Sequence, residues 1–181
     1  QRYFVQRWDA SVGGLRKEGS FEEFTRRIVR TIASAETLYL DPESPGSLDW
    51  LQALEKNIAS DILNRRFLFN SPCLFSSAAG LTVQPEFAEL LYKRVDAMSF
   101  EDYVRIHSAR TKNQQLFACF VINVPDSIEG IFESVRDASV ISKFGGGVGS
   151  NFGHLREHGA VIGSRTSGQT SGPVSFMETW N

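Results

Sequence analysis

Cys119 is the residue whose chemistry stands out, because its thiol lies within the apolar run 116–123, LFACFVIN. A thiol gives up hydrogen readily and closes reversibly into a disulfide with a neighbouring thiol. A free cysteine also serves as a small buried apolar side chain, which is the commoner use of a lone cysteine on a strand. The run therefore allows two interpretations of Cys119, a reductant or a packing residue.

A helix and a glycine cluster follow Cys119, and both suit contact with an anionic ligand. Asp126 is predicted to cap this helix, Glu129 to complete a capping box, and the cluster Gly145–Gly147 to end it. Helix starts offer free amides, and glycines let bare backbone approach a ligand. The alternatives are a plain cap and a plain helix terminator. The cluster fits neither a Walker loop nor a dinucleotide fingerprint, because it stands between helix and strand.

Local signals define the elements of the first hundred residues, which are predicted to be helical. Ser20 and Glu23 form a capping box ahead of apolar residues at helical spacing, and Ser47 is predicted to cap a second helix. Pro85 is predicted to open a third helix and Ser99 to cap a fourth. The apolar stripes of these helices predict a core and carry no functional signal.

The elements around Cys119 predict a βαβ unit, because strand, helix and strand follow one another. The nearly continuous apolar run 116–123 predicts a strand that is covered on both faces. The helix after it has a broad apolar stripe, which suits either a core or a dimer interface. A last helix is predicted to begin at Pro173, and the sequence stops at Asn181 within that apolar helix. We therefore expect a piece of a larger protein, from a split gene, by processing or by trimming.

Composition narrows the function classes for this chain of 181 residues. The net charge of −2 argues against non-specific binding to nucleic acid or to a membrane surface. The sequence holds no run of eighteen apolar residues and no signal peptide at its start. Cys73 and Cys119 are too far apart for the common zinc spacings, so no metal site is predicted. Sparse cysteines without a secretory signal predict a reducing, cytoplasmic setting.

Several motifs occur together in a fixed order: Asn70–Leu74, Ala118–Phe120, Asp126–Gly130, Ile141–Gly147, Leu155–Arg156 and Ser171–Met177. In this order they resemble the large catalytic subunit of ribonucleotide reductase, over roughly residues 60–181. The wording FGGGVG and SGPVSFM is most similar to the adenosylcobalamin-dependent class. The resemblance implies an α/β fold, or α+β for a fragment. In it, a helical region 1–69 precedes residues 70–181 as the first βαβ portion of a ten-stranded α/β barrel, with a helical insertion at 80–113.

The resemblance also implies a role for individual residues. Cys119 resembles the first member of the redox cysteine pair, whose second member lies outside this chain. Cys73 stands where relatives often carry threonine, and its thiol is interpreted as packed. Substrate-binding positions are implied at Ser71, Ala118 and Gly147, and at Ala118 the contact must come from the backbone. Effector-binding positions are implied at Asp126, Ser127, Ile128, Lys143, Arg156, Gly163 and Ser164. As isolated surface charges, Lys143 and Arg156 would simply be solvated.

The implied function is reduction of ribonucleotides to deoxyribonucleotides by thiyl-radical chemistry. Its implied cofactor is adenosylcobalamin, bound mainly by parts outside this chain, and a deoxynucleoside triphosphate is the implied effector. Implied partners are the ribonucleotide substrate, the C-terminal remainder of the reductase, a thioredoxin-like reductant and a second copy in a homodimer. One alternative is a non-catalytic fragment that dimerises and binds effector, and another is the same portion of a reductase with a di-iron partner subunit. Whether substrates are di- or triphosphates stays open.

Overall fold

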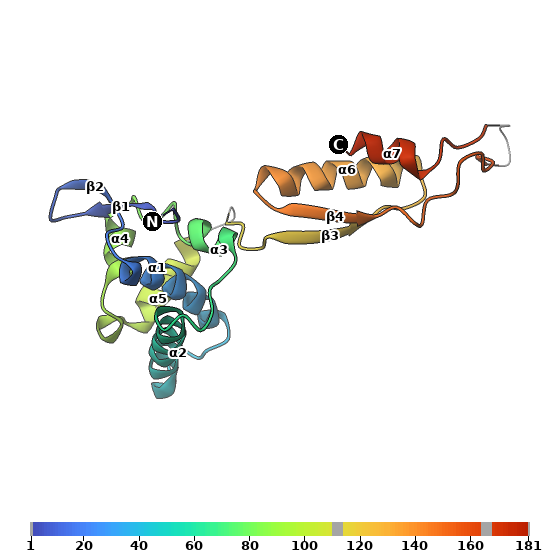
Figure 1. The fold of residues 1–181 in the computed structure, drawn as a ribbon. Coiled ribbons are helices and arrows are strands. Elements are labelled where there is room, and N and C mark those ends of the chain that lie inside the picture. The colour runs from blue at the N-terminus through green and yellow to red at the C-terminus, as the bar shows by residue number, and fades with distance from the viewer. Residues whose placement is uncertain (1, 110–113, 164–167, 181) are drawn as a thin grey trace. The chain divides into compact units, whose positions relative to one another are not determined.

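The computed structural model describes residues 2–109, 114–163 and 168–180 (Figure 1). Its contacts divide the chain into two compact units, residues 1–116 and 117–181. In the described part of the chain, no helix has the length and apolar character needed to cross a membrane. Helices and small sheets are both present, as the α/β or α+β prediction required.

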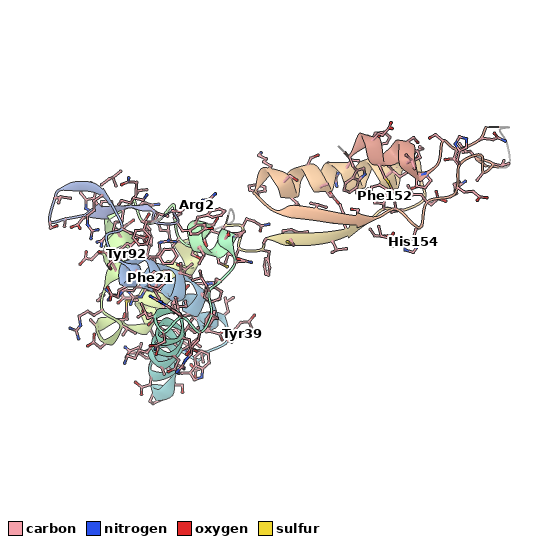
Figure 2. The ribbon with its side chains drawn as sticks, viewed as in Figure 1. Arg2, Phe21, Tyr39, Tyr92, Phe152 and His154 are labelled. Carbon is pink, nitrogen blue, oxygen red and sulfur yellow. The ribbon has the colours of Figure 1, made fainter. Side chains whose placement is uncertain are left out.

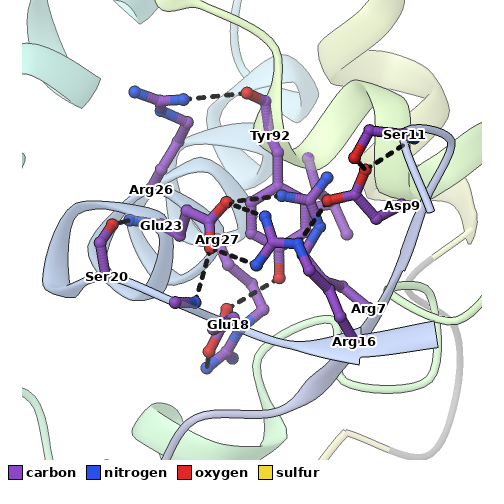
Figure 3. Close-up of polar contacts among 12 residues, drawn as sticks. Arg7, Asp9, Ser11, Arg16, Glu18, Ser20, Glu23, Arg26, Arg27 and Tyr92 are labelled. Carbon is purple, nitrogen blue, oxygen red and sulfur yellow. Dashed lines mark hydrogen bonds and ion pairs between the residues drawn. The ribbon is translucent and has the colours of Figure 1, made fainter.

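The first unit begins with a hairpin, which the helical prediction for residues 1–69 missed. Its strands β1 (Gln6–Asp9) and β2 (Gly14–Lys17) pair antiparallel. Both strands carry many charges, so they lack the alternating apolar pattern that marks a strand in sequence. Hydrogen-bonded ion pairs attach the hairpin to the following helix. The Glu23 carboxylate accepts hydrogen bonds from the guanidinium groups of Arg7 and Arg16 (Figure 3). The hydrogen bond from Arg16 also lowers the pKa of Glu23.

Two long helices form the centre of this unit, α1 (Phe21–Ala33) and α2 (Pro45–Leu63), with the 3-10 helix η1 (Ser34–Leu38) between them. The predicted cap of α1 is confirmed, since the Ser20 hydroxyl accepts from the Glu23 amide at 3.1 Å. The prediction that Ser47 caps α2 is wrong. That helix begins two residues earlier, at Pro45, and the Ser47 hydroxyl instead donates to the Asp41 carbonyl.

Shorter helices complete the first unit: α3 (Ser71–Ser76), α4 (Pro85–Tyr92), η2 (Val95–Ala97) and α5 (Phe100–Ala109). The predicted starts at Pro85 and Ser99 are confirmed, and Ser99 and Asp102 exchange side-chain and backbone hydrogen bonds as in a capping box. Helices α4 and α5 share one apolar core with α1 and α2. The described residues 80–109 of the segment 80–113 therefore pack with the N-terminal helices, and the origin of this segment as an insertion stays a prediction.

Two buried arginines of α1 each form a cluster with a glutamate and a tyrosine. Arg27 pairs with Glu18 at 2.7 Å, and the Tyr92 hydroxyl donates to the same carboxylate at 2.8 Å (Figure 3). Arg30, one turn further on, is paired in the same way with Glu55 and Tyr103. Burial, followed by the adjacent carboxylate, raises the pKa of both tyrosines.

The second unit contains the predicted βαβ order: β3 (Cys119–Asn123), α6 (Ile128–Lys143) and β4 (Gly147–Asn151), followed by α7 (Pro173–Thr179). The two strands pair parallel. Helices α6 and α7 lie on one face of this sheet (Figure 1). Phe152, labelled in Figure 2, meets the Trp180 ring edge-on at a centroid distance of 5.4 Å in the core beneath α7. Helix α7 begins at Pro173 as predicted.

Candidate functional site

The thiol of Cys119 lies on the uncovered face of the β3–β4 sheet. Strand residues alternate between faces, so Phe120 and Ile122 are half-buried, whereas Cys119 and Val121 are exposed, Val121 by 88%. The prediction of a strand covered on both faces is therefore wrong for the described residues. The prediction failed because consecutive apolar residues do not reveal which face is covered.

Glycines of β4 stand opposite the exposed residues of β3. The register pairs Cys119 with Gly147 and Val121 with Gly149. Because glycine has no side chain, bare backbone lies beside the thiol. The Gly147 amide donates to the Ala118 carbonyl at 2.7 Å, and a Cβ at Gly147 would lie 3.5 Å from that oxygen. The site therefore combines an accessible thiol with an open backbone surface.

The glycine cluster divides into a helix terminator and a strand residue. Gly145 has a φ of +84°, its amide donates to the Ser142 carbonyl at 2.9 Å, and the Gly146 amide donates to the Ile141 carbonyl at 3.1 Å. These two bonds form a Schellman motif at the end of α6. The terminator interpretation thus accounts for Gly145 and Gly146, while Gly147 begins β4.

The cap of α6 lies one residue later than predicted. Ser127, not Asp126, is the cap residue, and its hydroxyl accepts from the Gly130 amide at 3.1 Å. Gly130 also lets the turn close on Pro125, because a Cβ there would lie 2.7 Å from the proline Cβ. The predicted cap fails because Arg156 takes up the carboxylate of Asp126.

Asp126 and Arg156, two of the predicted effector positions, contact each other. The Arg156 Nε lies 2.8 Å from one carboxylate oxygen of Asp126, and the Arg156 amide donates to the other at 3.3 Å. These hydrogen bonds lower the pKa of Asp126. Both side chains are more than one third exposed, so this charged pair beside the start of α6 remains accessible to a ligand.

Of the other effector positions, Ser127 and Ile128 adjoin this pair at the start of α6, whereas Lys143 does not. Lys143 is the last residue of α6, about 22 Å from Ile128 at the usual rise of a helix, and its ammonium lies 5.8 Å from the centre of the Phe144 ring. Gly163 has a φ of +71° in the loop after Arg156. Ser164 lies outside the described residues.

Ser71 and Cys73 lie in the first unit, whereas Cys119 lies in the second. Ser71 is the first residue of α3, and its hydroxyl is 3.3 Å from that of Tyr3. Cys73 is buried, its thiol donates to the Leu116 carbonyl at 3.2 Å, and burial raises its pKa. This environment agrees with a packed thiol at Cys73, and Cys119 is the accessible one.

The sequence reasoning did not identify the Asp126–Arg156 pair, because 30 positions separate its members and no local pattern joins them. A search of the described residues finds no group of three or more His, Cys, Asp and Glu side chains that could hold a metal ion.

Comparisons with known proteins find one family model, described as ribonucleotide reductase, barrel domain, which matches residues 117–181. A vitamin B12-dependent ribonucleoside-diphosphate reductase of Thermoplasma acidophilum is 46% identical over 90 residues, which are 48% of this chain and 12% of that protein. A vitamin B12-dependent ribonucleotide reductase of Streptomyces avermitilis is 30% identical over 167 residues, 92% of this chain and 14% of the relative. A ribonucleoside-diphosphate reductase subunit alpha of Helicobacter pylori is 36% identical over 74 residues, 41% of this chain and 9% of the relative.

The matched region of the family model coincides with the second unit, which carries Cys119 and the Asp126–Arg156 pair. The longer matches extend over the first unit as well. The chain nevertheless spans only 9–14% of the length of these curated relatives.

Proposed function

We propose that this chain, as a member of the ribonucleotide reductase family, supplies the reductant strand and the effector helix of an enzyme that converts ribonucleotides into deoxyribonucleotides. The observation that carries the proposal is the accessible thiol of Cys119 opposite Gly147. A ribose needs close approach to a reducing thiol, and the glycine leaves backbone where a side chain would obstruct it. The βαβ unit is then the first portion of the ten-stranded barrel.

The reductive step uses Cys119 with a second cysteine in the remainder of the reductase. The two thiols deliver two electrons and two protons, the 2′-oxygen of the ribose leaves as water, and the thiols join as a disulfide. A thioredoxin-like protein then reduces this disulfide. In this scheme the Ala118 backbone and Gly147 hold the ribonucleotide, and the substrate role that the resemblance implies for Ser71 stays a prediction.

The relatives from Thermoplasma and Streptomyces are named as vitamin B12-dependent, which favours adenosylcobalamin as the cofactor. When bound, this cofactor supplies the radical that starts the reaction. Following the resemblance, we assign the cofactor mainly to parts of the reductase outside this chain, and give this chain the thiol and the backbone contacts.

The start of α6 is proposed to bind a deoxynucleoside triphosphate effector. The amides of a first helical turn and a nearby guanidinium suit phosphate oxygens, and Asp126 can accept from a ribose hydroxyl. Ser127 and Ile128 supply backbone there, and Gly163 and Ser164 belong to the adjoining loop. Because Lys143 lies at the far end of α6, it would meet an effector bound to a second copy.

A second candidate function is a non-catalytic module that dimerises and binds effector. Helix α6 favours it, because Ile128, Phe132 and Val140 remain about half exposed along this helix. The likeness to the Helicobacter subunit alpha also keeps a di-iron partner subunit as an alternative to adenosylcobalamin.

Reductase assays of this chain joined to the remaining reductase sequence separate these functions. We expect turnover with adenosylcobalamin and a dithiol, and loss of turnover with a protein reductant in the variant Cys119→Ser. The variant Cys73→Ser is the matched control and keeps turnover. Full activity of Cys119→Ser with a protein reductant would contradict the redox role, and binding of effector without any turnover would support the non-catalytic module.

A further inference from the structure

A cleft in the first unit shares no residue with the proposed reductase site. It has a volume of about 790 Å³ and lies between α1, α2 and η2. Clefts of roughly 300–1,000 Å³ are the size that small-molecule ligands occupy in proteins. Its lining residues are Glu22, Thr25, Arg26, Glu55, Lys56, Ala59, Ser60, Leu63, Asn64, Arg94, Val95 and Asp96.

Thr25, on the α1 side of the cleft, has a buried hydroxyl without a partner. Its side chain is 1% exposed, and its hydroxyl oxygen forms no hydrogen bond with any described residue. Thr31 on the same helix shows the usual arrangement, since its hydroxyl donates to the Arg27 carbonyl at 2.7 Å. A buried hydroxyl without a partner costs free energy, so the wall of the cleft at Thr25 is incompletely satisfied by the protein itself.

Several charges of the cleft are neutralised within the protein. Glu55 accepts hydrogen bonds from both Arg30 and Tyr103. Arg94 and Asp96 form an ion pair with each other at 2.7 Å. These groups therefore contribute little net charge to a ligand.

Among the described residues, Arg26 and Lys56 form no ion pair of their own, although the charge of Lys56 acts on the Asp96 carboxylate. Arg26 donates to the Tyr92 carbonyl at 2.9 Å, a neutral acceptor (Figure 3). Lys56 forms no ion pair with a described residue, and neither does Glu22. With Arg30 counted as the partner of Glu55, the cations Arg26, Arg30, Lys56 and Arg94 outnumber the three carboxylates Glu22, Glu55 and Asp96 by one, so the cleft has a net positive charge of one.

We propose that this cleft binds a small organic anion. The apolar body of the ligand would lie against Ala59, Leu63 and Val95, and its phosphate or carboxylate group would lie between Arg26 and Lys56. The Thr25 hydroxyl has almost no accessible surface, so it would reach the ligand only after a rotation of its side chain exposes it. Nothing in this proposal depends on the reductase function, because the cleft shares no residue with the proposed site.

Four probes of equal ring size test the charge preference: phenyl phosphate, benzoate, benzyl alcohol and benzylamine. Each is titrated into the full chain up to about 10 mM while backbone amide shifts are followed by NMR, a range that detects weak binding. We expect saturable binding of phenyl phosphate, benzoate or both, with shifts confined to α1, α2 and η2. Preference for one anion identifies a phosphorylated or a carboxylate ligand, and added salt weakens either.

The variant Lys56→Gln is expected to weaken anion binding about fivefold, which is the upper range for an exposed charge. Lys17→Gln, an exposed lysine outside the cleft, is the matched control and leaves binding unchanged. Ala59→Phe fills the apolar part and abolishes binding, and circular dichroism confirms that each variant folds. No saturable binding of either anion, equal binding of benzylamine, or equal losses in the two lysine variants would overturn the proposal.

Discussion

Arg30 in the first unit and Cys119 in the second are both polar residues on regular elements, but their surroundings are opposite. Arg30 has no exposed surface and donates hydrogen bonds to Glu55 and to three backbone carbonyls around the end of α4. Cys119 lies on an open sheet face beside Val121, which is 88% exposed.

This difference separates residues that stabilise the fold from residues that are accessible for chemistry. The first unit uses buried charge to fix how its helices pack, because each such group must find all its partners. Among its described residues, the second unit has only Val124, Ile131 and Leu155 as a buried apolar cluster, and it leaves the strand face free. We infer that changes in the first unit act mainly on stability, whereas changes on the open face act mainly on function.

The largest effect on stability is expected for Arg30→Met. This variant leaves the buried Glu55 carboxylate without its cation, which typically costs about 3–5 kcal/mol. Urea unfolding followed by circular dichroism measures the loss, and hydrogen exchange assigns it to the first unit. Arg66→Gln is the control, because Arg66 and Asp61 form an exposed pair worth less than about 1 kcal/mol. If Arg30→Met lost no more unfolding free energy than the control, buried charge would not be a structural difference between the two units.

The next largest effect is expected for Gly130→Ala in helix α6 of the second unit. In an exposed helix the change stabilises by about 1 kcal/mol. At Gly130 the added Cβ would lie 2.7 Å from the Pro125 ring, so we expect a net loss of about 1–2 kcal/mol.

The control for this prediction is Gly149→Ala on the open face of the same sheet. Its Cβ would lie 3.9 Å from the Phe120 carbonyl, an ordinary contact, so unfolding should shift by less than about 0.5 kcal/mol. Equal losses in both glycine variants, measured by urea unfolding, would show that the open face is as constrained as the helical one.

The helices whose starts were predicted correctly have strong local signals. Ser20, Pro85, Ser99 and Pro173 each mark a start through a cap or a first-turn proline, and such signals depend on neighbours within four residues. The N-terminal hairpin was not predictable in this way, because its charged strands are attached through Glu23 of α1.

The residues of the candidate site were proposed from motif order and their roles stay a prediction, whereas their arrangement was not predictable. The motif order identified Cys119, Asp126 and Arg156, but the pairing of Asp126 with Arg156 is a contact across 30 positions. The cap at Ser127 follows from this contact, since Asp126 is engaged elsewhere. The cleft around Thr25 gave no sequence signal at all, because residues of three separate elements form it.

A smaller effect is expected for valine-to-threonine substitutions, made at a buried position of the first unit and at an exposed position of the second. Val29 of α1 is fully buried, so Val29→Thr places a hydroxyl in the core at a cost of about 1 kcal/mol. The cost stays at the low end because a helical threonine can donate to a carbonyl four residues back, as Thr31 does. Val121→Thr on the open face should cost less than about 0.5 kcal/mol. Urea unfolding of both variants checks this, and equal costs would break the comparison.

The smallest effect concerns the charged pair beside α6, and it is a shift of pKa. Arg156 holds the pKa of Asp126 below its ordinary value of 3.8, mainly through their side-chain hydrogen bond. Because the folded-state pKa is lowered, the pairing contributes above pH 3.8 and is lost as the pH falls through the folded-state value. In Arg156→Gln the carboxyl should titrate at its ordinary value, which NMR of the Asp126 side chain measures. Arg136→Gln removes another exposed arginine of this unit and should leave that pKa unchanged. If the pKa of Asp126 stayed low in Arg156→Gln, the start of α6 itself would stabilise the carboxylate. The Asp126–Arg156 pair would then not mark a difference between this accessible site and the buried clusters of the first unit.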